Sequence, residues 1–286
     1  MDAPPIRIGL KAYQQVHPIA TQREVWLAAE EAGFDHIWPY DHLVALGDPA
    51  LPVYDGWTIL AAIASVTTRI RIGLNVSGNL YRHPAITAKL ATTVDHLSDG
   101  RLEMGIGAVR DGDEFQMFGM PFPPVGERIA MLDEACTVIR GLWTQPRFSH
   151  DGRYYRLTEA IAEPKPVQRP HPRIWIGGSG RTKTLAVVAR HADVWHSNAR
   201  TIEDTIDLSR VLDERCAEIG RDPGSLRRSV GIRMTEGKPP LEQARDAIDA
   251  GFSELLVNFG NTRADPLGDL DVAARLLPDL RDLAAR

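Results

Sequence analysis

The stretch TRIRIGLNVSGNLYRHPAITAKLATTVDHLSDGRLEMGIGAVRDGDEFQMFG, residues 68–119, decides the fold of this chain. Apolar, β-favouring residues over Ile70–Val76 predict a buried strand. Pro84 suits the first turn of a helix, and Gly100 suits the left-handed exit of that helix. A second strand is predicted over Leu102–Ile106. Strand, helix and strand in this order form a βαβ unit, and we expect its chemistry just after each strand.

The same alternation of strand and helix recurs along the whole chain. Strands are predicted near Ile6–Leu10, His36–Trp38, Ile70–Val76, Leu102–Ile106, Arg173–Ile176, Val194–His196, Ser229–Arg233 and Glu254–Asn258. Helices are predicted near Thr21–Ala32, Trp57–Ser65, Pro84–Leu97, Glu127–Leu142, Arg181–Arg190, Ile202–Ile219, Leu241–Ala250 and Leu270–Leu283. These eight units imply a parallel sheet with right-handed crossovers, and they favour an α/β (β/α)8 TIM barrel over an open sheet. We expect a single domain over residues 1–286.

Two segments are longer than the usual connections of such a barrel. Residues 109–126 precede the fourth predicted helix, and residues 145–172 precede the fifth predicted strand. In the second segment, Asp151-Gly152 between apolar and aromatic residues predicts a hairpin. Its prolines then favour extended chain. We expect both insertions at the C-terminal face of the strands, as lids or walls of a site.

The composition is that of an ordinary globular enzyme. Of the 286 residues, 43% are hydrophobic and 25% are charged, and the net charge of −5 gives no reason to expect nucleic acid or an anionic membrane as a partner. No apolar run approaches the length of a membrane span, and no signal peptide is visible, so we expect a cytoplasmic protein. Cys136 and Cys216 lie within helical patterns and are predicted to be buried free thiols.

Several catalytic patterns are missing from the 286 residues. There is no His-x-His or His-Glu-x-x-His pattern, so a metallohydrolase is not indicated and we expect no metal site. There is no Gly-x-Ser-x-Gly elbow for a serine nucleophile.

Five segments carry a family resemblance. They are GFDHIWPYDHL (33–43), YRHPAITAKLATTVDHLSDGR (81–101), FPPVGER (122–128), PKPVQRPHPRIWIGGSG (164–180) and HADVWHSN (191–198). Together they resemble the luciferase-like monooxygenase superfamily, and especially its actinobacterial oxidoreductases that use coenzyme F-420, an 8-hydroxy-5-deazaflavin. The resemblance implies a homodimeric barrel enzyme that moves a hydride between this deazaflavin and a small organic substrate.

Two other interpretations stay open. One is an FMN-dependent luciferase-like monooxygenase that uses reduced flavin and dioxygen, because both cofactors share a ring-and-phosphate layout. The other is a barrel that binds a cofactor without catalysing a reaction. Deazaflavins carry hydrides and react poorly with oxygen, so the first implied function is that of a reductase or dehydrogenase.

Asp41 and His42 follow the second predicted strand. Histidine titrates near neutral pH and can exchange a proton there, although a loop histidine is also often only hydrogen-bonded. The resemblance implies that His42 lies beside the cofactor ring as the proton donor or acceptor. Asp41 is then expected to orient the imidazole, and His36, which lies within the strand, is expected to be structural.

The end of the third strand and the start of the next loop are expected to hold the ring. Relatives have a bulge at Asn75, Val76 and Ser77, usually with a non-proline cis peptide bond, which would be Asn75–Val76 here. An ordinary strand end is the alternative. Gly107 would allow the backbone to approach a bound ring closely.

A glycine-rich loop lies between the fifth strand and its helix. Its residues are Gly177, Gly178, Ser179, Gly180 and Arg181. Such a loop turns backbone N–H groups toward an anion at a helix N-terminus, and Arg181 adds a charge-assisted contact. A tight turn without a ligand is the alternative. By resemblance, Ser197 and Asn198 add further contacts to the cofactor phosphate.

The substrate side of the site is less defined by the sequence. Arg110 stands where deazaflavin-dependent sugar-phosphate dehydrogenases have a glutamate, and many relatives have Trp. It either recognises an anionic or carbonyl group or is a solvated lid residue. Glu114 matches a common family glutamate that structural pairing would also explain. Tyr40 and Trp57 are further candidates for lining a substrate pocket.

Overall fold

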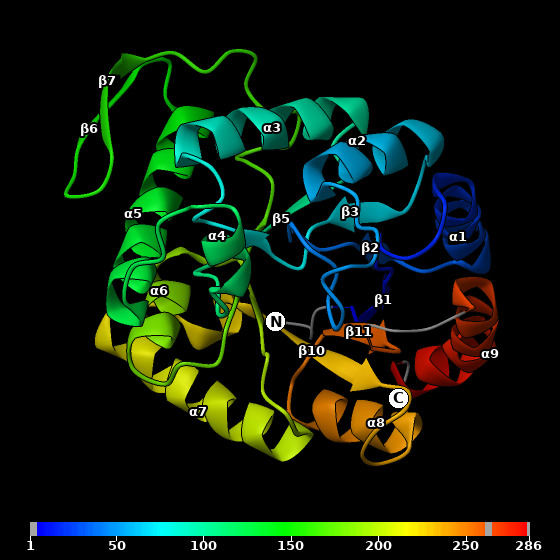
Figure 1. Cartoon of the computed structure of the whole chain (residues 1–286). Coiled ribbons are helices and arrows are strands. Elements are labelled where there is room, and N and C mark those ends of the chain that lie inside the picture. The colour runs from blue at the N-terminus through cyan, green and yellow to red at the C-terminus, as the bar shows by residue number, and fades with distance from the viewer. Residues whose placement is uncertain (1–4, 261–264, 285–286) are drawn as a thin grey trace.

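The computed structural model of the 286-residue chain describes residues 5–260 and 265–284. Within these residues, eight parallel strands form a closed barrel (Figure 1). They are β1 (Arg7–Lys11), β2 (His36–Trp38), β3 (Arg71–Gly73), β5 (Leu102–Gly107), β8 (Ile174–Gly177), β9 (Val194–His196), β10 (Arg227–Arg233) and β11 (Glu254–Asn258). Neighbours pair in the order β3-β2-β1-β11-β10-β9-β8-β5, and the pairing of β3 with β5 closes the ring. The predicted TIM barrel is confirmed.

Helices surround the barrel and cover its outer face (Figure 1). They are α1 (Ile19–Ala32), α2 (Gly56–Val66), α3 (Pro84–Leu97), α5 (Val125–Thr144), α6 (Lys183–His191), α7 (Ile202–Glu218), α8 (Pro240–Asp249) and α9 (Pro266–Ala284). Each lies close to its predicted bounds, and Pro84 is the first residue of α3 as expected. The sequence did not predict α4 (Asp113–Met117) or the 3-10 turn Pro223–Ser225. Cys136 and Cys216 are buried and unbridged, as predicted.

The third predicted strand is interrupted. β3 ends at Gly73, and a separate short strand, β4 (Ser77–Gly78), pairs with the end of β5. Between them the peptide bond Asn75–Val76 is cis, so the expectation of a cis bond at this place is confirmed.

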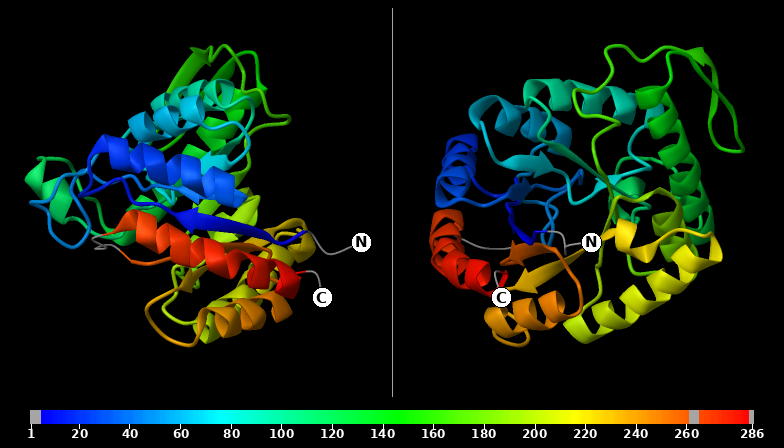
Figure 2. Two further views of the ribbon diagram at one scale, coloured as in Figure 1. Left: turned by 90° about the vertical axis from the view of Figure 1, so that its right-hand side faces the viewer. Right: turned by 180° about the vertical axis from the view of Figure 1, so that it is seen from behind.

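The first insertion, residues 109–126, carries α4 on the side of the barrel where the strands end. The side view in Figure 2 shows β1 running toward the loops on this side. The second insertion forms the hairpin of β6 (Phe148–Asp151) and β7 (Arg156–Ala160), which lies outside the ring of helices (Figure 1). Asp151 is the last residue of β6 rather than the centre of a two-residue turn, because residues 152–155 form the loop.

The location predicted for the second insertion is wrong. Residues 145–172 connect α5 to the start of β8, so they approach the barrel at the amino ends of the strands. Gln168 there accepts from Arg71 Nη2 at 2.6 Å and donates to the carbonyl oxygen of Leu102 at 2.7 Å, and both partners lie at strand beginnings. Helix-to-strand connections of a barrel lie opposite the face that carries the active site.

Side chains along a barrel strand alternate between the helices and the interior. The interior is charged at the amino ends, where Arg7 and Glu103 lie. It is aromatic in the middle, where the rings of Trp38 and Trp175 lie 4.5 Å apart. His36 is fully buried there, accepting from Trp38 Nε1 and contacting Glu254, which agrees with its expected structural role. Among residues 5–260 and 265–284, no helix is both long and apolar enough to cross a bilayer.

Candidate active site

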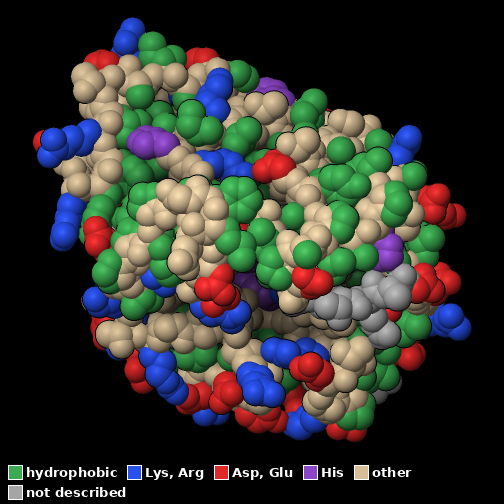
Figure 3. Space-filling view, in the orientation of Figure 1, with side chains coloured by type: hydrophobic (Ala, Val, Ile, Leu, Met, Phe, Trp, Pro, Cys, Tyr) green, Lys and Arg blue, Asp and Glu red, His purple; other side chains and the backbone are tan. Residues whose placement is uncertain are grey.

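Three glycines, Gly105, Gly107 and Gly177, lie near the carboxyl ends of strands β5 and β8, which form part of the barrel mouth. A Cβ on Gly105 would lie 1.9 Å from the carbonyl oxygen of Leu74, and one on Gly107 would lie 2.7 Å from Val76 Cγ2. A Cβ on Gly177, on the neighbouring strand β8, would lie 3.0 Å from Val76 Cγ1. The glycines therefore make room for Val76, which follows the cis bond, and Figure 3 shows this face hollowed near its centre. Gly107 was predicted to allow the backbone to approach a bound ring. In the structure, the group that lies against Gly107 is the side chain of Val76.

His42 lies at this mouth and is held by a carboxylate. Its Nδ1 lies 2.8 Å from Glu114 Oε1, and the imidazole is 30% exposed while Glu114 is 5% exposed. The other oxygen, Glu114 Oε2, accepts from the backbone N–H of Leu43 at 2.7 Å. Because a carboxylate only accepts, Nδ1 carries the proton and Nε2 is left to exchange one. The expectation that Asp41 orients His42 is wrong, since the carboxylate in contact with the ring is that of Glu114.

Tyr81 anchors the helix that supplies this glutamate. Its hydroxyl donates to Glu114 Oε1, and its ring stacks on Phe115 of α4 at 4.9 Å. Burial alone would raise the pKa of Glu114, but hydrogen bonds from His42, Tyr81 and the Leu43 amide bring it below its ordinary value. The pKa of Tyr81 is raised by burial and by its bond to Glu114, so the phenol remains a donor. The 109–126 insertion thus positions His42 through α4.

Asp41 belongs to a second, buried network. Its Oδ2 accepts from Ser77 Oγ at 2.7 Å and from Arg82 Nη1 at 2.7 Å. The Gly78 amide lies 3.3 Å from the same oxygen. Trp57 Nε1 donates to Ser77 Oγ at 3.1 Å. These hydrogen bonds fix the backbone that follows the cis bond. Asp41 therefore supports the backbone of the mouth and does not contact His42.

The two aromatic candidates for a substrate pocket do not reach one. Trp57 is 4% exposed and Tyr40 is 2% exposed. The Tyr40 hydroxyl donates to Gln15, and its ring lies 5.2 Å from that of His42. Trp57 supports the β4 backbone and Tyr40 supports the imidazole, so the expectation that they line a substrate pocket is wrong.

The glycine-rich loop follows β8 as predicted. Gly178 has a φ of +146°, which residues with a Cβ avoid, and a Cβ there would lie 2.6 Å from Thr184 Cγ2. The Ser179 hydroxyl accepts from the Asn198 amide at 3.0 Å, so the loops after β8 and β9 lie together. Gly180 is on the same turn, and its carbonyl oxygen accepts from Leu185 of α6.

Three predicted contact residues remain: Ser197, Arg181 and Arg110. Ser197 is buried and shares a hydrogen bond of 3.0 Å with Thr205 Oγ1, so its hydroxyl supports the loop. The guanidinium of Arg181 pairs with Asp207 on α7. The Arg110 side chain is 88% exposed and pairs with the neighbouring Asp111 at 3.0 Å. In this structure Arg110 is a solvated residue of the first insertion.

Two polar groups near the mouth have no partner in the described part of the chain. Asn75 Nδ2 is buried and has no hydrogen bond. Lys11, at the end of β1, has neither a hydrogen bond nor a carboxylate, and burial together with Arg233 lowers its pKa to about 8. The inward alternation of Arg7, Gly9 and Lys11 along β1 is the sequence signal for the position of Lys11. Groups of three or more metal-ligating side chains are absent from residues 5–260 and 265–284.

A closed α/β barrel with a hollow mouth, a carboxylate-held histidine and a glycine-rich loop at the strand ends has the architecture of a barrel enzyme. A family model described as luciferase-like monooxygenase matches residues 4–276. The chain belongs to this family.

Relatives within the family use different cofactors. An uncharacterised protein of Mycobacterium tuberculosis is 33% identical over 225 residues, which are 77% of this chain and 76% of that protein. An FMNH(2)-dependent dimethylsulfone monooxygenase of Pseudomonas putida is 29% identical (90% and 72% covered). An F420-dependent glucose-6-phosphate dehydrogenase of Kineococcus radiotolerans is 28% identical (83% and 70% covered).

The fold is also that of a solved structure. An F420-dependent secondary alcohol dehydrogenase in complex with an F420-acetone adduct superimposes with a TM-score of 0.86 and 18% identity, and the match covers 97% of this chain and 99% of that chain. At this identity the likeness concerns the barrel itself.

Proposed function

We propose that this chain is a coenzyme F-420-dependent oxidoreductase that moves a hydride between the deazaflavin and a small organic substrate. The observation that carries the proposal is the contact of 2.8 Å between His42 and Glu114 at the barrel mouth. Hydride addition to a carbonyl, imine or alkene must be accompanied by a proton, and oxidation of an alcohol must release one. A half-exposed imidazole beside a hollow is a suitable donor or acceptor at neutral pH.

The carboxylate makes His42 a directed proton carrier. Glu114 accepts from Nδ1 and fixes the ring orientation, as second-sphere carboxylates do for catalytic histidines. Nε2 is then the atom that gives or takes the proton. Asp41 contributes indirectly, because its bonds to Ser77 and Arg82 hold the backbone beside the mouth.

The residues at the mouth fit a planar ring with an anionic tail. Val76, Gly107 and Gly177 would support one face of the ring, and the unpaired Asn75 amide offers it a hydrogen-bond donor. The loop from Gly177 through Arg181, together with Ser197 and Asn198, would hold the phosphate with backbone N–H groups. Coenzyme F-420 would supply the hydride, and the protein would supply orientation and the proton.

FMN is the second candidate cofactor. The Pseudomonas putida monooxygenase, which is 29% identical, is FMNH(2)-dependent by its name, and it covers a larger share of this chain than the dehydrogenase does. An FMN-dependent monooxygenase would use the same glycine loop. The carboxylate-held proton carrier favours hydride chemistry, because a reductase or dehydrogenase needs a matched proton in each turnover.

Binding measurements separate the two cofactors. We expect the purified chain to bind F-420 with a micromolar dissociation constant in fluorescence titrations and to bind oxidised or reduced FMN at least tenfold more weakly. If reduced FMN binds more tightly than F-420, the proposed function would instead be that of an FMN-dependent monooxygenase. Lack of binding for either would favour a barrel without this cofactor chemistry.

The role of His42 is tested by the variant His42→Gln. After a substrate has been found by screening alcohols and carbonyl compounds for a change in deazaflavin absorbance, we expect kcat to fall about 100-fold or more, with F-420 affinity retained. His150→Gln is the matched control, because His150 also contacts a glutamate, Glu134, at 3.2 Å but lies on the hairpin. Unchanged turnover in His42→Gln would remove the assigned proton role. We further propose a cytoplasmic homodimer, which light scattering and cell fractionation would test.

A further inference from the structure

A cavity of about 420 Å³ opens at the amino ends of the strands, opposite the candidate active site. Arg7, Arg71 and Arg173 line it from the barrel, and Arg169 and His171 line it from the second insertion. The insertion is fixed there, because Gln168 bonds both carboxylate oxygens of Asp95, at 3.0 and 2.7 Å. The cavity is therefore a formed feature of the barrel base and lies apart from His42 and the glycine loop.

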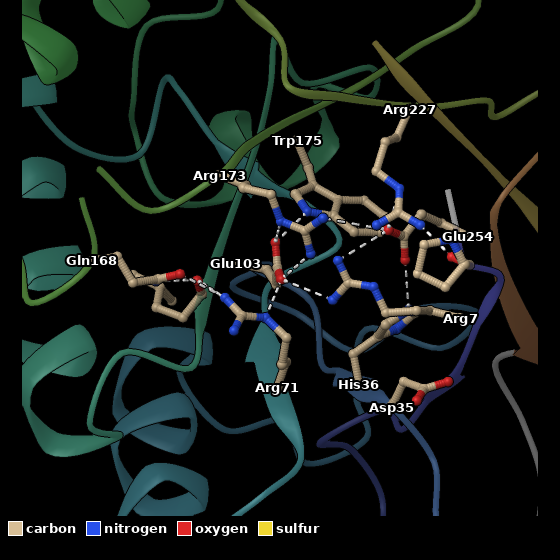
Figure 4. Close-up of polar contacts among 12 residues, drawn as sticks. Arg7, Asp35, His36, Arg71, Glu103, Gln168, Arg173, Trp175, Arg227 and Glu254 are labelled. Carbon is tan, nitrogen blue, oxygen red and sulfur yellow. Dashed lines mark hydrogen bonds and ion pairs between the residues drawn. The ribbon is translucent and has the colours of Figure 1, made fainter. Parts of the chain in front are cut away.

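The charges behind this cavity are not balanced. Glu103 and Glu254 are fully buried, and Arg7, Arg71, Arg173 and Arg227 surround them (Figure 4). Figure 4 shows the guanidinium groups converging on these two carboxylates from different strands. Four cations thus face two anions in a chain whose net charge is −5. Three of these arginines, Arg7, Arg71 and Arg173, also line the cavity, whereas Arg227 does not.

Arg7 shows the consequence of this excess. Its only contacts to carboxylates in the described chain are long ion pairs, 3.7 Å to Glu103 and 3.4 Å to Glu254, and its guanidinium donates no hydrogen bond. Burial lowers the pKa of Arg7; Glu254 and Glu103 raise it and Arg173 and Arg227 lower it, so that the pKa stays below its ordinary value. An anion in the cavity would supply the missing acceptors.

Arg169 is the second incompletely paired cation. Its guanidinium contacts backbone oxygens, those of Pro166 and Gln168, and no carboxylate of the described residues. The side chains of Arg7, Arg71 and Arg173 are 20%, 25% and 24% exposed, so their N–H groups reach solvent through the cavity. Arginine forks match the tetrahedral oxygens of a phosphate group and bind them in pairs.

We propose that this cavity, which we call the basal cavity, is a binding site for a dianionic phosphate group. The ligand is free phosphate or a small phosphorylated metabolite, and its oxygens bridge Arg7, Arg173 and Arg169. Asp193 also lines the cavity; its Oδ2 accepts from the Ile174 amide at 2.8 Å and its charge acts on Arg173, so the lining has four arginines and one carboxylate. This site is separate from the proposed cofactor phosphate loop.

Titration calorimetry with inorganic phosphate at constant ionic strength tests the site. We expect one site per chain, and we expect Arg169→Gln to raise the dissociation constant at least fivefold. Arg156→Gln is the matched control, because Arg156 lies in the same insertion, is 80% exposed and pairs with Asp151 away from the cavity. Circular dichroism would establish that both variants are folded.

Parallel titration with glycerol 3-phosphate distinguishes the two sources. Tighter binding of the ester assigns the site to a phosphorylated metabolite, and equal or weaker binding assigns it to free phosphate. The proposal is overturned if phosphate does not bind, or if Arg169→Gln and Arg156→Gln weaken binding equally. It is also overturned if binding survives in Arg169→Gln unchanged, since phosphate would then occupy the loop after β8.

Discussion

The two ends of the barrel interior are built in opposite ways. At the amino ends, long charged side chains such as Arg71, Glu103 and Arg173 bond to one another, and the two arginines line the basal cavity. At the carboxyl ends, Gly105, Gly107 and Gly177 carry no side chains, and Val76 and the Leu74 carbonyl group occupy the space beside them. The same parallel strands supply both ends, because successive inward positions on one strand reach different depths of the barrel. Ion pairs between strands join the base, whereas close backbone approach around Val76 shapes the mouth.

The buried carboxylates at the two ends of the barrel also have different partners. Glu103 at the base is fully buried and contacts several arginines at once. Glu114 at the mouth contacts a single half-exposed histidine, one phenol and one backbone amide. A carboxylate surrounded by arginines is held ionised and takes no part in proton exchange. A carboxylate beside one histidine leaves that histidine a free nitrogen, so the mouth is the end suited to chemistry.

The largest expected effect concerns the base. Glu103→Gln removes one anion from among Arg71, Arg173 and Arg7, and we expect the free energy of unfolding to fall by about 3–5 kcal/mol. Urea denaturation measures it. Glu163→Gln is the control, because Glu163 is 56% exposed and pairs only with Lys165. A loss below about 1 kcal/mol for Glu103→Gln would mean that the base is not a rigid unit.

The same carboxylate gives the base a pH dependence. Burial alone would raise the pKa of Glu103, but Arg173 and Arg71 lower it from 4.5 to about 2. Because the folded pKa lies below the unfolded one, this group stabilises the fold fully above about pH 4.5, and its contribution is lost as the pH falls toward about 2. In that window, the stability of Glu103→Gln should depend less on pH than that of the parent chain.

At the mouth, Glu114→Gln keeps the shape of the side chain and removes its charge. We expect kcat to fall about 10- to 100-fold with little change in F-420 affinity, because His42 loses the carboxylate that orients its ring. Glu134→Gln breaks a similar histidine–carboxylate contact on the hairpin and should leave kcat unchanged. Equal kcat values for Glu114→Gln and Glu134→Gln would show that Glu114 does not contribute to the reaction.

The smallest expected effect concerns the hollow itself. Gly107→Ala places a methyl group 2.7 Å from Val76 Cγ2, so Val76, which we propose supports one face of the ring, must move. We expect the cofactor to bind about tenfold more weakly, a change of about 1.4 kcal/mol. The double variant Gly107→Ala/Val76→Ala should restore affinity. Gly126→Ala is the control, since its methyl group would meet only the flexible end of Lys183. If the double variant does not regain affinity, Gly107 does not act on the cofactor site through Val76.

The sequence predicted local structure well because strands and helices follow from short-range periodicity and turn chemistry. His36–Trp38, Val194–His196 and Pro84–Leu97 have the predicted bounds. Position along a strand also predicted that His42 and the loop from Gly177 would lie at the carboxyl ends. The side of the barrel on which residues 145–172 lie was mispredicted, although the order of elements, helix before strand, determines it.

The partners of individual side chains were beyond local reasoning. Glu114 is 72 positions from His42 in the chain, and Asp41, adjacent to His42, points to Ser77 instead. Neighbouring residues at a strand end point in opposite directions, so adjacency in the sequence is a poor guide to contact. Helical periodicity places Trp57 on the buried face of α2 with Leu60 and Ala64, but it does not reveal the bond of its Nε1 to Ser77.

By itself, the sequence determined the order of elements, the closed parallel barrel and the histidine at its mouth, because backbone preferences and apolar patterning act over a few residues. The tertiary structure decided which carboxylate holds His42, which glycines make room for Val76, and that four arginines meet two glutamates at the base. Those contacts arise only when strands far apart in the chain are brought to the same depth of one closed sheet.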